Sequence, residues 1–136
     1  MTQEDKELLL RDLCGRLPYS VKIKSPSNCW TSEMSTMELS EIFKGDDGLF
    51  RIGDTGALLE YSKPYLFPMS SMTEKQRKQL ESITHYNIEL HADRYYNVVD
   101  IDSFTELQEF YNRHHLDYNN LISLGLAIDA TGKNIY

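Results

Sequence analysis

The sequence predicts one α+β domain, residues 1–136, in which a small curled antiparallel sheet of the SH3-like or open-barrel kind lies between an N-terminal helix and C-terminal helices. Helix-capping patterns begin at Thr2, Thr73 and Ser103, whereas residues 19–61 hold short apolar runs separated by turn clusters. A chain of 136 residues buries roughly 70% of its unfolded surface in one core. Folding therefore needs neither a metal ion nor a disulfide.

The first predicted element is an amphipathic helix that ends at Gly15. Thr2 is a typical N-cap residue, and Asp5 follows it three positions later. Leu9 and Leu13 lie on one apolar stripe, and a glycine just beyond such a stripe is a typical C-terminal signal. Leu17-Pro18 then turns the chain, because the residue before a proline avoids the helical region.

Residues 19–61 predict five short strands. Val21 and Ile23 alternate with Lys22 and Lys24, as expected for a strand with one buried face. Gly-Asp-Asp-Gly and Asp-Thr-Gly clusters between the later runs are typical hairpin turns. Short strands at such regular spacing favour a small antiparallel sheet that curls toward a barrel. The five runs are "YSVKIK", "CWTSEM", "TMELSEIF", "LFRIG" and "ALLEY".

The segment "KPYLFP", residues 63–68, is predicted to be an extended connector that lies across the fold. Pro64 and Pro68 each lack a backbone N–H, which argues against a central strand. Tyr65 and Phe67 give the connector apolar surface to bury. Two interpretations stay open: a structural connector, or an edge that binds a partner.

The second half of the chain predicts helices with one or two further strands. Thr73 and Gln76 form a capping box for a helix over residues 74–83. Residues 85–91, "HYNIELH", alternate like a half-buried strand, and residues 97–101 predict a shorter one.

Three elements are predicted near the C-terminus. Ser103 caps a helix whose apolar stripe leads to His114, and Asp117 caps a further short turn that Gly125 ends. Residues 126–129 are a possible edge strand. Residues 130–136 are predicted to fray.

Composition argues against nucleic-acid and membrane partners. The chain has 21 acidic and 14 basic residues and a net charge of −7, and Glu74 and Glu81 flank its one basic cluster, formed by Lys75, Arg77 and Lys78. No run approaches the roughly 20 apolar residues of a membrane span. Cys14 and Cys29 are interpreted as small buried hydrophobes in a reducing compartment, so a cytoplasmic location is expected.

The main candidate site is a corner formed by His114, His115 and Asp117, since imidazoles beside a carboxylate are plausible metal ligands. Adjacent histidines point about 100° apart on a helix, whereas metal-binding pairs are usually three or four residues apart. The structural alternative has His114 packed on the helix stripe and His115 at the helix end. A weaker metal alternative uses Glu89 and His91, about 7 Å apart on one face of the predicted strand.

Three segments resemble, in the same order, the recurrent segments of an uncharacterised family of small proteins from gut Bacteroidetes and their prophages. They are "EDKELLLRDLCGRLPYSVKIK", "KPYLFPMSSMTEKQ" and "FYNRHHLDYNNLISLGLAID", about half of the chain. The last of them contains His114, His115, Asp117 and Tyr118. The resemblance implies no activity and no cofactor.

The sequence therefore predicts a non-enzymatic protein-interaction module of a phage or mobile element. Catalytic motifs are missing from the sequence, whereas nine tyrosines, Trp30 and the Tyr65–Phe67 run are suited to contact surfaces. The candidate binding residues are His114, His115, Asp117, Tyr118, Tyr65 and Phe67. One alternative is a metal-dependent hydrolase or small-ligand-binding protein that uses the histidine corner. Another is acidic mimicry of nucleic acid by the acids between Glu89 and Glu109.

Overall fold

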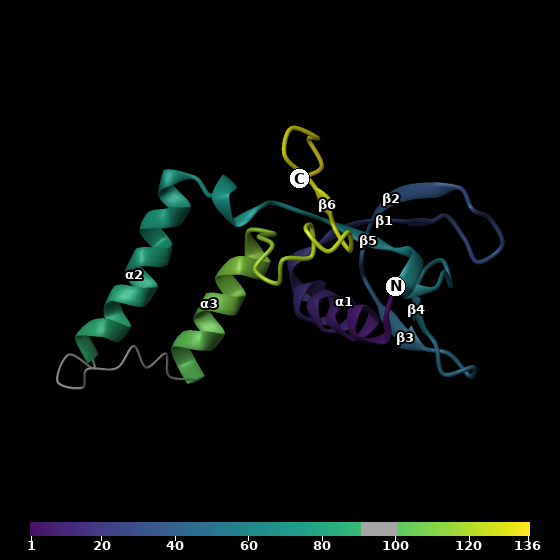
Figure 1. Ribbon diagram of the computed structural model, residues 1–136, viewed down its shortest axis with the longest axis horizontal. Helices are drawn as coiled ribbons and strands as arrows, with labels where there is room; N and C mark the ends of the chain where they lie inside the picture. The colour runs from purple at the N-terminus through teal and green to yellow at the C-terminus, as the bar shows by residue number, and fades with distance from the viewer. Residues whose placement is uncertain (91–100) are drawn as a thin grey trace.

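The computed structural model describes the backbone of residues 1–90 and 101–136 and the side chains of residues 1–83 and 104–136. It confirms the predicted α+β class. A helix precedes two small sheets and two later helices follow them, and neither sheet closes into a barrel (Figure 1). The main elements are α1 (Gln3–Arg16), β1 (Lys22–Pro26), β2 (Met34–Glu38), β3 (Ile42–Lys44), β4 (Phe50–Ile52), β5 (Lys63–Leu66), α2 (Glu74–Leu90), α3 (Ile101–Arg113) and β6 (Ile128–Asp129).

Helix α1 begins as its capping pattern predicts. The Asp5 backbone N–H donates to the Thr2 hydroxyl at 3.1 Å, and the Thr2 N–H donates to the Asp5 carboxylate at 3.2 Å. The helix continues one residue past Gly15 to Arg16, and a 3₁₀ turn, Leu17–Tyr19, follows it. Ser20, with φ of 56°, reverses the chain into β1.

The larger sheet has the strand order β2-β1-β5-β6 (Figure 1). Strand β1 pairs antiparallel with both β2 and β5, whereas β5 and β6 are parallel. Strands β3 and β4 form a separate hairpin around the predicted Gly-Asp-Asp-Gly turn. Three strand predictions are corrected: residues 29–33 form a loop, Leu59–Tyr61 form a 3₁₀ turn, and the run over residues 36–43 is divided between β2 and β3. The predicted burial of Cys14 and Cys29 is also wrong, because both are exposed.

The prediction that Pro64 cannot lie in a central strand is wrong, because β5 has β1 on one side and β6 on the other. In antiparallel sheets, hydrogen-bonded pairs alternate with pairs that exchange no backbone bonds. Hydrogen bonds from Ser27 to Glu33 and from Leu39 to Val21 lie at the two ends of the β1–β2 pairing and fix this alternation. The backbone N–H and C=O groups of Ile23 therefore point toward β2. Pro64 is opposite Ile23, so the pairing with β1 needs no Pro64 N–H.

Helix α2 has the predicted capping box but is longer than predicted. The Thr73 N–H donates to Gln76 Oε1 at 3.0 Å, and the Gln76 N–H donates to the Thr73 hydroxyl at 3.2 Å. The helix runs to Leu90, so the predicted strand over residues 85–91 is wrong as far as residue 90, and His91 lies outside the described residues. Helix α3 begins at Ile101, before Ser103, so Ser103 is not its N-cap. The predicted strand over residues 97–101 lies outside the described residues except for Ile101, which is helical.

One hydrophobic core joins α1, the sheet and the C-terminal segment. Leu13 of α1 and Ile23 and Leu66 of the sheet are fully buried, and Leu121 packs against them. Beyond β5, the Phe67 N–H donates to the His115 carbonyl at 2.8 Å. The predicted connector therefore spans the fold as a paired strand and its extension, and it links the sheet to the start of the C-terminal segment.

The C-terminal residues do not fray. The Ala130 N–H donates to the Leu66 carbonyl at 2.8 Å. The Tyr136 hydroxyl donates to the Tyr65 carbonyl at 2.7 Å and accepts from the Lys22 N–H at 3.0 Å. The Tyr136 hydroxyl therefore bridges the Lys22 N–H of β1 and the Tyr65 carbonyl of β5, which do not bond to each other directly. These two residues are next to the paired residues Ile23 and Pro64.

Candidate functional site

His114 packs at the end of α3, as the structural alternative predicted. Its ring lies 4.7 Å from the Phe110 ring, and its Nδ1 is 3.3 Å from Gln76 Nε2 of α2. Burial lowers the pKa of His114, and the positive charges of Arg113 and Lys75 lower it further. The ring is therefore neutral at pH 7 and links α3 to α2.

His115 lies in a different environment from His114. Its backbone has φ of 55°, and its ring stacks on Tyr136 at 3.7 Å with an interplanar angle of 10°. Burial lowers the pKa of His115 to about 4, with smaller effects from Arg16 and His114. A neutral ring cannot interact with the helix dipole as an imidazolium would, so the predicted role at the helix end is not seen.

Asp117 caps the following turn, as predicted. Its carboxylate accepts from the Leu121 N–H at 2.7 Å and from the Ile122 N–H at 2.9 Å. Both oxygens are used in this way and the residue is buried, so they are poorly placed to bind a metal ion.

The histidine corner does not form a metal site. Among the residues that the structure describes, no group of three or more His, Cys, Asp or Glu side chains is placed to hold a metal ion. Glu89 is on helix α2, so the proposed strand geometry with His91 is wrong. The predicted acidic face between Glu89 and Glu109 lies mainly in residues whose side chains are not described.

Tyr118 belongs to a buried polar cluster that sequence reasoning missed. The Arg16 guanidinium donates to both Asp12 oxygens, at 2.7 and 3.0 Å, and to the Leu116 carbonyl at 2.8 Å. The guanidinium carbon lies 5.2 Å from the centre of the Tyr118 ring, and Asn119 donates to Asp12 at 2.8 Å. Burial raises the pKa of Tyr118, and the Asp12 carboxylate adds to this effect.

This polar cluster holds α1 against the C-terminal segment. The Arg16 and Asp12 side chains are both 0% exposed. Asn112 of α3 adds a bond from its amide to the Gly15 carbonyl at 3.2 Å. The sequence signal was present, since Arg16 continues the stripe of Leu9 and Leu13 at helical spacing and Asp12 precedes it by four residues. The cluster therefore has a structural role.

Tyr65 and Phe67 offer little surface to a partner. Tyr65 is 7% exposed, and its hydroxyl lies 3.2 Å from that of Thr36. The half-buried Phe67 ring contacts Tyr136 at 5.8 Å. Tyr136 keeps 44% of its surface exposed, yet its hydroxyl lies between two strands, and burial raises its pKa to about 12. These aromatic rings hold the fold together.

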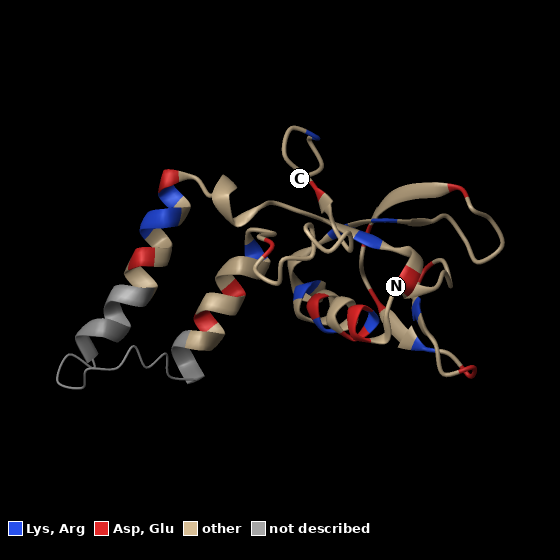
Figure 2. Ribbon diagram, viewed as in Figure 1, with Lys and Arg blue, Asp and Glu red and all other residues tan. Residues whose placement is uncertain are grey.

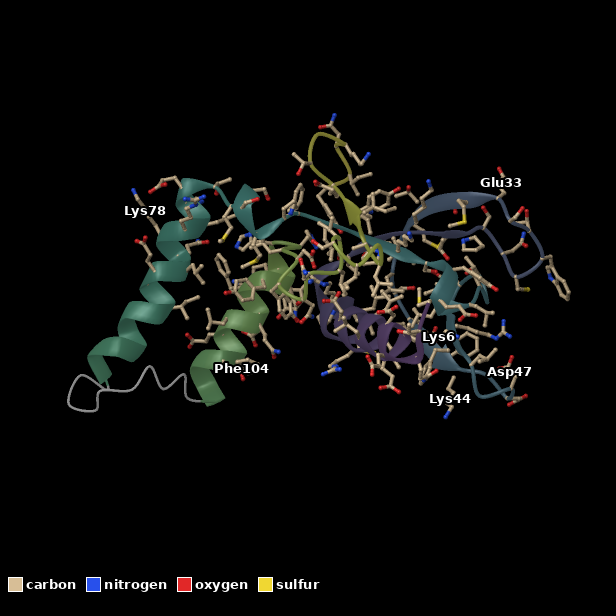
Figure 3. All side chains as sticks on the ribbon, viewed as in Figure 1. Lys6, Glu33, Lys44, Asp47, Lys78 and Phe104 are labelled. Carbon is tan, nitrogen blue, oxygen red and sulfur yellow. The ribbon has the colours of Figure 1, made fainter. Side chains whose placement is uncertain are left out.

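Among the residues whose side chains are described, the most exposed aromatic one lies elsewhere, in the loop between β1 and β2. Trp30 is 92% exposed, and Met34 and Tyr61 beside it are 40% and 59% exposed. These three residues, with Pro26 and Cys29, surround a shallow hollow, and we call them the Trp30 surface. Figure 3 shows the loop extending from the sheet beside Glu33.

The loop that presents Trp30 is held by four hydrogen bonds, one of them from the Ser27 hydroxyl to the Glu33 carbonyl at 3.2 Å. The Trp30 N–H donates to Asn28 Oδ1 at 2.8 Å, and the Glu33 N–H donates to the Thr31 hydroxyl at 3.1 Å. The Ser27 N–H donates to the Glu33 carbonyl at 2.8 Å and closes the base of the loop. These bonds hold the loop backbone on both sides of Trp30.

A second hollow lies between α1 and the β3–β4 hairpin. Leu10, Leu49 and Phe50 line it, and the Lys6 ammonium forms an ion pair with Glu60 at 2.6 Å at its rim. Gln3 and Glu7 also line this hollow, so it combines an apolar patch with charged and polar groups.

Comparisons of the chain with protein-family models, with curated protein sequences and with solved structures find no match. The resemblance to a family from gut Bacteroidetes and their prophages therefore stays a prediction. Within the described parts of the chain, no helix is long and apolar enough to span a bilayer.

Proposed function

We propose that this protein is a non-enzymatic protein-interaction module that binds its partner through the Trp30 surface. The proposal rests on one observation, the 92% exposure of the Trp30 side chain in a loop that hydrogen bonds hold in place. Exposing a large aromatic ring to water forgoes the free energy of burying it, and tryptophan is enriched among the residues that dominate binding energy. A buried position in a complex would recover that free energy.

Two features of the Trp30 surface favour binding of a protein segment. Met34 and Tyr61 extend the apolar area beside the indole, and the hollow between them is open to solvent. The hydrogen bonds of Asn28 and Thr31 order the loop before binding, so a partner loses less conformational freedom in forming the complex. An origin in a phage or mobile element and a cytoplasmic location remain part of this proposal, from the resemblance and the composition.

Replacing Trp30 by alanine is expected to weaken this binding strongly. Selection of a displayed random-peptide library on the wild-type protein should enrich a set of peptides, and Trp30→Ala should bind those peptides about 30-fold more weakly, as for an interface hot spot. Affinity would be measured by titration of the synthetic peptides. Phe104→Ala is the matched control, because Phe104 is 53% exposed on α3, far from the loop (Figure 3), and should leave affinity unchanged.

Equal affinity of the three proteins for the enriched peptides, or a library that yields no enriched peptide, would contradict the proposed function. Pulldown from the native host is a second route, with the same two variants as controls.

The metal-dependent alternative has its own test. Elemental analysis of protein purified without an affinity tag is expected to find zinc, iron and manganese well below one ion per chain, because the Asp117 oxygens bind backbone N–H groups and the described residues place no third ligand beside the two histidines. One tightly held ion per chain, lost in a His114→Ala variant, would instead support the hydrolase or ligand-binding alternative.

A further inference from the structure

Strand β2 has one free edge whose backbone groups can be assigned. The Ser27 N–H donates to the Glu33 carbonyl, and the Leu39 N–H donates to the Val21 carbonyl. Both pairs continue the β1–β2 register, so the odd-numbered residues of β2 face β1. The N–H and C=O groups of Met34, Thr36 and Glu38 therefore point away from β1.

No described strand pairs with this side of β2, which is the first strand of the order β2-β1-β5-β6. Figure 1 shows β2 at the outer edge of the sheet. Met34, Thr36 and Glu38 are also the exposed side chains of the strand. A row of unpaired backbone donors and acceptors is a template for another extended segment.

We propose that the partner adds an extended segment to the free edge of β2, as a further strand of the sheet. This inference rests on the proposed function, because the Trp30 surface begins where β2 does, at Met34. A segment hydrogen-bonded to Met34, Thr36 and Glu38 would lie next to Met34, the residue of β2 that lines the hollow with Trp30 and Tyr61. Backbone bonds hold the segment, and one large apolar side chain in the hollow fixes its register.

The charges along this edge indicate a basic segment. Glu33 and Glu38 lie at the two ends of β2, and Figure 2 shows acid at the loop end of the strand. Glu38 reaches Lys22 at 3.7 Å, whereas Glu33 makes no ion pair with another described residue. Lysine or arginine near the ends of the segment would complement both acids.

The same charges disfavour a second copy of this chain as the occupant. Each copy has a net charge of −7 and would present the same two glutamates at the interface. The occupant is therefore a segment of a different protein.

The probe for this proposal is a synthetic peptide of about ten residues, the length of a long strand, in which Thr and Val alternate, one Phe lies near an end and Lys flanks both ends. Its binding to the full chain would be titrated, and amide hydrogen exchange of the complex followed residue by residue. The Met34, Thr36 and Glu38 amides should exchange about tenfold more slowly when the peptide is bound. The Ser35 and Met37 amides face β1 and serve as internal controls, with unchanged exchange.

A Thr36→Pro variant removes one outward N–H that β1 does not use, together with the contact of the Thr36 hydroxyl with Tyr65. Its melting temperature should therefore match that of a Thr36→Val variant, which loses the hydroxyl contact but keeps the N–H. The Thr36→Pro variant should bind the probe about tenfold more weakly. A probe flanked by Glu, or N-methylated at alternate residues, should bind weakly to the wild type.

Three results would overturn the inference. The first is no binding of the Lys-flanked probe, and the second is binding that leaves the Thr36 amide unprotected. The third is protection of that amide that rises with protein concentration alone, which would assign the edge to a second copy. If any of these occurs while library peptides still bind in a Trp30-dependent way, the interaction function stands and strand addition fails.

Discussion

Replacing Arg16 by methionine is expected to lower the free energy of unfolding by about 3–5 kcal/mol. Methionine keeps much of the volume of the arginine side chain, so the loss of stability measures mainly the effect of removing the charge. Asp12 would be left buried without its guanidinium partner, and the Leu116 carbonyl would lose a donor. Domains of this size are stable by only about 5–15 kcal/mol, so the variant should lose a large part of its stability. Chemical denaturation followed by circular dichroism measures the change.

Two controls separate the ion pair from the general effect of a lost arginine. Arg11 is exposed on the same helix, so Arg11→Met should change stability by less than about 0.5 kcal/mol. The double variant Asp12→Leu/Arg16→Met removes both charges and should recover part of the loss, although Asn119 then lacks its acceptor. Equal effects of Arg11→Met and Arg16→Met would show that the buried pair does not hold α1 to the C-terminal segment.

Lowering the pH from 7 to 5 is expected to destabilise the protein partly through His115. Its pKa is about 4 in the folded chain against an ordinary value of 6.5, so the unfolded chain binds more protons between these values. The contribution of His115 to the free energy of unfolding should therefore be fully present above about pH 6.5 and be lost as the pH drops toward 4. One such histidine contributes at most about 1.4 kcal/mol per pH unit, and less here because the ring is only partly buried.

The matched variant is His115→Asn, since asparagine tolerates the left-handed backbone at this position and does not titrate. Its free energy of unfolding at pH 7 will be lower, because the stacking on Tyr136 is lost. Its slope between pH 5 and 6.5 should be shallower than that of the wild type. Identical slopes would mean that His115 is protonated equally in the folded and unfolded chains.

Elements that depend on neighbouring residues were predictable from the sequence. The capping box of Thr2 and Asp5, the capping box of Thr73 and Gln76, and the Asp117 cap each join side chains to backbone groups a few residues away. Such local bonds depend on residue type and spacing, which the sequence contains.

The errors concern features that distant residues decide. Pro64 is tolerated in a central strand because the register with β1 places it in a pair that exchanges no backbone bonds. The alternation in residues 85–91 suggested a strand, yet α2 continues from its Thr73 cap through residue 90. Tyr136 was predicted to fray, but its hydroxyl joins β1 to β5 and its ring covers His115.

The candidate site shows the same division. Sequence reasoning identified His114, His115 and Asp117 as chemically capable residues, and the structure uses all three to pack or cap. It also noted Trp30 as suited to recognition, but the exposure of Trp30 depends on which residues surround the loop. Tyr61, which lies about thirty positions along the chain, joins Trp30 only through the fold.

The most direct test of the central claim, that this protein contacts its partner through the Trp30 surface, is an amide chemical-shift map of the protein with a library-selected peptide bound. The proposed function predicts that the perturbed residues cluster at 26–38 and Tyr61. Chemical-shift perturbations confined to residues 110–118, with the Trp30 loop unchanged, would contradict the proposed function. They would indicate binding at the histidine corner instead.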